Sequence, residues 1–122
     1  DNSLQGTSMN NYTPDSWAIL RMTTPEETIY KVLASWYGGF DTGDSWKLSS
    51  GITEVNDFEG YYDLPQYSGS SYHCNKNSEH ISVIMAMMLS SWQEQVKEKA
   101  GMSIEAISME EFIDEWYRNE TS

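Results

Sequence analysis

Hydrophobic residues recur at helical spacing soon after the start of the chain. Within residues 25–37 they stand three or four positions apart, at Ile29, Val32, Leu33, Trp36 and Tyr37. Thr24 can cap a helix that begins at Pro25, and Glu27 stands where a capping box has an acidic side chain. Gly38 and Gly39 follow, and glycine readily takes the left-handed conformation found at helix ends. The pattern predicts a helix over residues 25–37.

Two later segments have the same spacing. Residues 78–100 carry a stripe made of Ile81, Ile84, Met85, Met88, Leu89 and Trp92, which Val83 and Met87 widen. The first half of this predicted helix is apolar on most sides, so we expect it to run through the centre of the domain. A capping box at residues 108–111 precedes the last stripe, which consists of Met109, Phe112, Ile113, Trp116 and Tyr117.

The middle of the chain changes to short segments rich in tyrosine and β-branched residues. We predict strands at residues 46–50, 52–55, 60–64 and 70–74, with turns at residues 56–57 and 65–69. Residues 12–22 fit either a strand or a helical turn, and we favour the strand.

The order of these elements predicts an α+β fold in one domain. We expect a small antiparallel β-meander of three to four strands packed against about three α-helices, formed by residues 9–122. Residues 1–8 are polar and lack the features of a signal peptide. We expect them to be a remnant of recombinant expression or a disordered tail, with Met9 as the natural start.

The charge balance narrows the classes of partner. The chain has 7 Lys and Arg against 19 Asp and Glu, a formal net charge of −12. Direct nucleic-acid binding is not expected, because phosphate binding depends on clustered basic side chains, and an anionic membrane is disfavoured for the same reason. No stretch approaches the ~20 apolar residues of a membrane-spanning helix. The single cysteine, Cys74, excludes an internal disulfide and fits a reducing cytoplasm.

Candidate catalytic chemistry is sparse. His73, Cys74 and His80 could suggest zinc, but adjacent strand residues point to opposite faces, so His73 and Cys74 do not suit one ion. The serine-containing turns lack the spacing of a nucleophile elbow. We therefore predict no catalytic residues, no metal and no cofactor. An enzyme that uses carboxylates or His80 remains a competing hypothesis, which requires a deep pocket with shifted titrating groups.

An acidic face is predicted on the last helix. Its members are Glu110, Glu111, Asp114 and Glu115, opposite the apolar stripe. The like-charged pairs four residues apart each cost about 0.2–0.5 kcal/mol. Such a face is commonly just solvated, but it can also orient a basic partner during docking. We take these four residues as the candidate partner-binding surface.

Three glycine-and-aromatic motifs follow one another between residues 30 and 92. The first, residues 34–40, includes Tyr37, Gly38 and Gly39, the second runs from Trp46 to Gly51, and the third contains Gly69. In order and spacing they resemble the ArdB/KlcA antirestriction family of plasmids, phages and genomic islands. They are similar, in turn, to its Tyr-x-Gly-Gly-Tyr segment after the first helix, its aromatic-x-Leu-Ser-Asn-Gly turn and its aromatic-Ser-Gly strand entry.

The resemblance implies a protein from a mobile element that blocks a host type I restriction-modification system without catalysis. Its partner would be the restriction enzyme or another host defence complex in the bacterial cytoplasm. The six motif positions also fit a structural role in turns and core. An acidic immunity or antitoxin protein that neutralises a basic toxin, such as a nuclease, is the alternative.

Overall fold

The computed structural model describes residues 10–38 and 43–120. In this part the elements are β1 (Asn11–Tyr12), β2 (Ser16–Thr23), β3 (Thr28–Trp36), β4 (Ser45–Leu48), β5 (Asn56–Phe58), β6 (Tyr61–Pro65), β7 (Ser71–Asn75), the 3-10 helix η1 (Lys76–Ser78), α1 (Val83–Val96), β8 (Ser103–Ile107) and α2 (Met109–Glu120). The predictions for residues 1–8 and for Gly39 fall outside the described residues.

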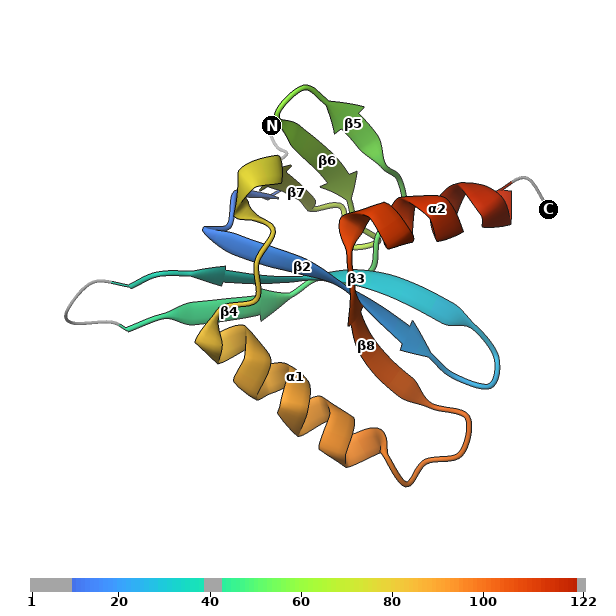
Figure 1. The fold of residues 1–122 in the computed structure, drawn as a ribbon. Helices are drawn as coiled ribbons and strands as arrows, with labels where there is room; N and C mark the ends of the chain where they lie inside the picture. Colours follow the sequence, from blue (N-terminus) through green and yellow to red (C-terminus); the bar gives the residue numbers. More distant parts are fainter. Residues whose placement is uncertain (1–9, 39–42, 121–122) are drawn as a thin grey trace, which may run out of the picture.

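A four-stranded antiparallel sheet forms the middle of the molecule, with the strand order β4-β3-β2-β8 (Figure 1). Strands β2 and β3 form a hairpin whose register runs from Ser16 opposite Ser35 to Thr23 opposite Thr28. Strand β8 joins the other side of β2, where Arg21 lies opposite Glu105. This central sheet carries both helices and the candidate site.

A second four-stranded sheet has the order β1-β7-β6-β5. Strands β5, β6 and β7 are antiparallel neighbours, whereas the short β1 pairs in parallel with β7. Leu64, Tyr72 and Cys74 of this sheet are buried together with Trp17 and Ile19 of the central sheet. The two sheets therefore share a hydrophobic core.

The central sheet is buried on both faces. Its residues Trp17, Ile19, Tyr30, Val32 and Ala34 belong to the core shared with the second sheet and α2. The opposite face carries a second core, in which Ala18, Leu20, Leu33 and Ile104 pack against Met85 of α1. Figure 1 shows the same arrangement, with α1 below the central sheet and α2 and the second sheet above it.

The predicted helix over residues 25–37 is wrong, because this segment forms β3. Consecutive residues from Val32 to Ser35 are all buried, since both faces of the strand are covered. A continuous apolar run also contains pairs three and four positions apart, so helical spacing does not distinguish it from a two-sided strand. The capping signal is real but local: the hydroxyl of Thr24 accepts the backbone N–H of Glu27 at 3.1 Å, in the turn of the β2–β3 hairpin.

The predicted arrangement is therefore wrong, although the described residues do combine helices and strands as expected. In place of one meander against about three helices, the described residues form two four-stranded sheets and two α-helices. Strand β8 was not predicted, and β5 begins at Asn56, where a turn was expected. Of the predicted strand at residues 52–55, only Ile52 forms an isolated bridge, to Gln66.

The second predicted helix is shorter than expected and does not run through the centre. Helix α1 lies on the outside of the central sheet and buries Met85, while Val83 and Met87 are 77% and 64% exposed. The predictions of a strand within residues 12–22 and of the strands β4, β6 and β7 are confirmed, as is the last helix. Within the described residues, neither helix has the length and apolar character required to cross a membrane.

Candidate functional site

Helix α2 begins at a point fixed by two side chains. The hydroxyl of Ser108 accepts the backbone N–H of Glu111 at 3.1 Å, as the capping box predicted. Oε2 of Glu79, from the segment before α1, accepts the backbone N–H of Met109 at 2.8 Å. Met109 and Phe112 are buried in the core shared with the second sheet. The orientation of the helix is therefore set by both hydrogen bonds and apolar packing.

One arginine joins α2 to the central sheet. Arg21 lies on β2, and its guanidinium contacts Glu105 on β8 at 3.0 Å and Glu111 on α2 at 3.2 Å, together with Glu115. Partial burial lowers the pKa of Arg21, but its carboxylate partners raise it by more, so the net shift is upward. Three carboxylates thus share one cation, and the cluster keeps a net negative charge.

Tyr30, which is itself buried, extends this cluster toward the aromatic side chains of α2. Its hydroxyl donates to Oε1 of Glu115 at 2.6 Å. Burial of the phenol, followed by the hydrogen bond and charge of Glu115, raises the pKa of Tyr30 to about 12. The rings of Tyr30, Phe112 and Trp116 pack together, with centroid distances of 5.1 Å from Tyr30 to Phe112, 6.3 Å from Tyr30 to Trp116 and 5.5 Å from Phe112 to Trp116. Tyr30 therefore connects the charged cluster to a cluster of aromatic rings.

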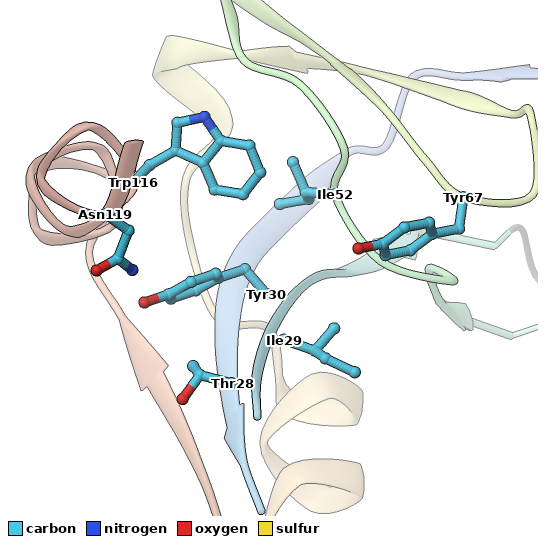
Figure 2. Close-up of a pocket in the computed structure, with 7 residues that line it drawn as sticks. All are labelled: Thr28, Ile29, Tyr30, Ile52, Tyr67, Trp116 and Asn119. Carbon is cyan, nitrogen blue, oxygen red and sulfur yellow. The ribbon is translucent and has the colours of Figure 1, made fainter. Parts of the chain in front are cut away.

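Beside Tyr30 lies a pocket with a volume of about 230 Å³. Figure 2 shows Trp116 and Asn119 reaching toward it from α2, Tyr30 at its middle, and Ile52 and Tyr67 on the opposite side. Its complete lining is Thr28, Ile29, Tyr30, Ile52, Tyr67, Trp116 and Asn119. The volume is below the roughly 300–1,000 Å³ typical of small-molecule sites, so it suits a single side chain better than a metabolite.

Backbone hydrogen bonds hold the wall opposite α2 in place. The N–H of Ile52 donates to the carbonyl of Tyr30 at 2.8 Å, and the N–H of Tyr67 donates to that of Gly51 at 2.9 Å. The buried side chain of Gln66 accepts the N–H of Gly51 at 3.1 Å and donates to the carbonyl of Leu64 at 2.8 Å. The pocket is thus built on a fixed framework.

Gly51 has a specific reason to be glycine. Its φ is +138°, and a Cβ atom placed there would lie 2.6 Å from Cδ2 of Tyr67. The absence of a side chain lets the Tyr67 ring lie directly over the backbone. This gives one position of the resemblance, Gly51, a structural role next to the pocket.

The four acidic residues predicted on α2 do not form one free face. Glu111 and Glu115 turn toward Arg21, and the side chain of Glu115 is only 16% exposed. Asp114 forms an ion pair with Arg118 on the same helix. Glu110 is exposed. Two of the predicted partner-binding residues therefore hold α2 on the sheet.

The remaining motif positions lie in turns and at strand ends. The backbone N–H groups of Tyr37 and Gly38, just after β3, donate to Asp15 at 2.9 Å and to Asp44 at 3.1 Å. Trp46 on β4 meets Trp92 of α1 edge to face at 5.4 Å. Gly69 lies in the turn before β7 with a φ of +94°. The segment before Tyr37 and Gly38 is β3, where the resemblance implies a helix.

The two histidines and the cysteine have different surroundings and form no common site. Cys74 is buried in the core, and burial raises the pKa of its thiol. His73, on the other face of β7, stacks on Tyr61 at 3.9 Å, and His80 is exposed. Within residues 10–38 and 43–120, no group of three or more His, Cys, Asp and Glu side chains is arranged to hold a metal ion.

Several residues of the pocket and the charged cluster were not identified from the sequence as functional candidates. Among them are Arg21, Glu105, Tyr30, Tyr67 and Trp116. One signal was present: Arg21 follows the apolar run of residues 17–20, and an arginine in a partly buried strand needs carboxylate partners. The aromatic residues gave no such signal, because each also fits a core position.

Comparisons with family models, with curated proteins and with solved structures found no match to this chain.

Proposed function

We propose that this protein is a non-catalytic antagonist of host defence, which inhibits a type I restriction-modification system in the bacterial cytoplasm by binding a basic surface of the enzyme. The observation that carries the proposal is the excess of carboxylates on a folded framework in which four of the seven Lys and Arg side chains already pair with carboxylates. The target class comes from the resemblance of the three glycine-and-aromatic motifs.

The arrangement of charges supports binding to a basic partner. Arg21 is shared by three glutamates, and Lys76, Lys97 and Arg118 each pair with a carboxylate. Exposed carboxylates remain on several sides of the molecule, at Glu26, Glu27, Glu54, Glu59, Glu98 and Glu110. Complementary potential accelerates docking onto a positive surface and disfavours acidic partners.

The framework supports inhibition by occupation of a surface. Helix α2 is held by capping, by apolar packing and by Arg21, so its outer side is presented without prior ordering. A preformed surface avoids the entropic cost of ordering loops on binding. A protein of this kind needs no reactive group of its own.

Phage plating tests the proposal. Cells that carry a type I restriction system and express the protein are expected to plate unmodified phage with nearly the efficiency of non-restricting cells. Modified phage should plate equally well with and without the protein. Unchanged restriction across several type I systems would contradict the proposal, and protection from a basic nuclease toxin instead would favour the immunity alternative.

A matched pair of charge reversals sharpens this test. Glu110→Lys and Glu98→Lys change the net charge equally, and both side chains are exposed. Glu110 lies on α2, whereas Glu98 follows α1 on the other side of the central sheet. We expect Glu110→Lys to weaken inhibition more than Glu98→Lys. Equal effects would contradict a binding surface on the α2 side.

A further inference from the structure

The pocket beside Tyr30 has aromatic walls and belongs to a protein with a formal net charge of −12. Tyr30, Tyr67 and Trp116 contribute three π-systems to its lining, and Ile29 and Ile52 contribute apolar surface. We infer that this pocket receives an arginine side chain of the partner protein. The inference rests on the proposed function, because it names the chemistry by which the acidic protein recognises its basic partner.

The aromatic walls favour a cation. The faces of tryptophan and tyrosine carry negative electrostatic potential and attract a cation within about 6 Å of the ring centroid. Trp116 reaches from α2 on one side and Tyr67 from the opposite side, with Tyr30 between them (Figure 2). The chain already uses tyrosine in this way: Nζ of Lys76 lies 4.7 Å from the ring centroid of Tyr62, and Nζ of Lys47 lies 5.3 Å from that of Tyr12.

The charge of the whole protein favours the same occupant. Its formal net charge is −12, and the two cations that act on Tyr30, Arg21 and Arg118, are each already paired with carboxylates. Glu115 also accepts the hydroxyl of Tyr30, which places a carboxylate at the far end of that ring. An incoming cation is therefore attracted, whereas an incoming carboxylate is repelled.

Size and shape select arginine. The volume of about 230 Å³ accommodates one side chain. A guanidinium is planar, stacks on aromatic faces and is more weakly hydrated than an ammonium group, so it loses less on entering a partly apolar pocket. The aliphatic stem of arginine can pack against Ile29 and Ile52 while its head lies against the rings.

A set of three short peptides tests the occupant. The probes are blocked pentapeptides of the form Gly-Gly-X-Gly-Gly, where X is arginine, lysine or citrulline, the neutral counterpart of arginine. Each is titrated into the 15N-labelled protein, and the indole N–H signal of Trp116, assigned with the variant Trp116→Phe, reports on the pocket. We expect the arginine peptide to bind at least tenfold more tightly than the citrulline peptide and more tightly than the lysine peptide.

Two variants locate the binding. Tyr67 is 71% exposed, so Tyr67→Ala should remove one wall without unfolding the protein, and we expect it to weaken arginine binding at least fivefold. Tyr117 is an exposed tyrosine of α2 that does not line the pocket, and Tyr117→Ala is expected to leave the affinity unchanged. Shifts confined to residues around Glu105 and Glu111, with Trp116 unmoved, would overturn the inference.

Other outcomes are equally decisive. Equal affinity for arginine and citrulline would show that charge is not recognised, and tighter binding of lysine would contradict the choice of arginine. Either result overturns the inference about the pocket without affecting the phage-plating test. Conversely, normal restriction together with specific arginine binding at Trp116 would contradict the proposed target and leave the pocket assignment intact.

Discussion

The two helices cover opposite faces of the same sheet by different means. Helix α1 packs through Met85 and partly buried neighbours such as Leu89 and Trp92, and its N-cap Ser82 meets Ser35 of β3 through a buried hydroxyl contact at 2.9 Å. Helix α2 packs through Phe112 and is also tied to β2 by Arg21. Within the described residues, the ion pair of α1 joins Glu94 and Lys97 of that helix region and does not reach the sheet.

This difference affects what each helix presents outside. Helix α1 exposes an uncharged surface that includes Val83 and Met87, and the contacts with the sheet described above are neutral. Helix α2 concentrates carboxylates at its contact with the sheet, and the aromatic pocket lies along the same contact. The electrostatic attachment of α2 thus places carboxylates at the edge of the helix, whereas the apolar attachment of α1 does not.

The largest expected effect is the loss of an apolar anchor. Phe112→Ala should lower the free energy of unfolding by about 3–5 kcal/mol, because it removes a fully buried ring and leaves a cavity. Met85→Ala, on the α1 side, should cost about 2–5 kcal/mol for the same reason. Denaturant unfolding measures both, and a cost below about 1 kcal/mol for either variant would contradict its place in the core.

Removal of the positive charge of Arg21 should have the next largest effect on the free energy of unfolding. Arg21→Met is expected to cost about 1.5–3 kcal/mol near pH 7, because Glu105, Glu111 and Glu115 lose their shared hydrogen-bonding partner. Lys97→Met removes an exposed pair on the α1 side and should cost no more than about 0.5 kcal/mol. Equal losses would contradict the distinction between the helices.

Alkaline titration tests the raised pKa of Tyr30, which is caused first by burial and then by the hydrogen bond and charge of Glu115. The pKa of Tyr30 is raised to about 12 in the folded protein, above the ordinary value of about 10 for a tyrosine in an unfolded chain. The contribution of the protonated Tyr30 hydroxyl to the free energy of unfolding is therefore fully present below about pH 10. It is lost as the pH rises through about 12. Tyr30→Phe should cost about 1–2 kcal/mol near pH 8.

The difference in unfolding free energy between wild type and Tyr30→Phe should narrow from pH 10 to pH 12, as followed by urea unfolding at each pH. Other tyrosines with raised pKa values, such as Tyr72, are present in both proteins, so they affect both curves alike. A constant difference across this range would contradict a raised pKa at Tyr30.

The smallest effect is expected on the outer face of α1. Met87→Ala should change the free energy of unfolding by no more than about 0.5 kcal/mol, because the side chain is largely exposed. The comparison with Met85→Ala uses the same residue type two positions earlier in the helix. A cost for Met87→Ala near that for Met85→Ala would place the outer face in a buried contact.

The sequence predicted some elements well because local signals agreed with their environment. At α2, the capping box of Ser108 and the stripe from Met109 to Trp116 indicate the same helix, and one face is buried. At β3, both faces of the strand are buried, so its apolar residues follow one another closely and also match the spacing of a helix. Burial on two sides depends on the partners α1 and the second sheet, which lie far along the chain.

The candidate site was predicted only in part for a similar reason. The carboxylates of α2 were identified, but the direction of Glu111 and Glu115 depends on Arg21, about 90 positions earlier. The pocket joins β3, the loop around Ile52, the turn at Tyr67 and the end of α2. No local sequence pattern predicts that these four segments lie together, because each residue alone is compatible with an ordinary core or turn position.

The central claim, inhibition by occupation of a partner, is tested most directly by a titration. A fixed amount of a purified type I restriction enzyme is mixed with increasing amounts of this protein, and DNA cleavage is measured at several incubation times. We predict that inhibition saturates near a fixed molar ratio, is independent of incubation time and is relieved when the protein is removed. Complete and lasting inactivation by a small fraction of a molar equivalent, increasing with time, would indicate catalysis and contradict the account.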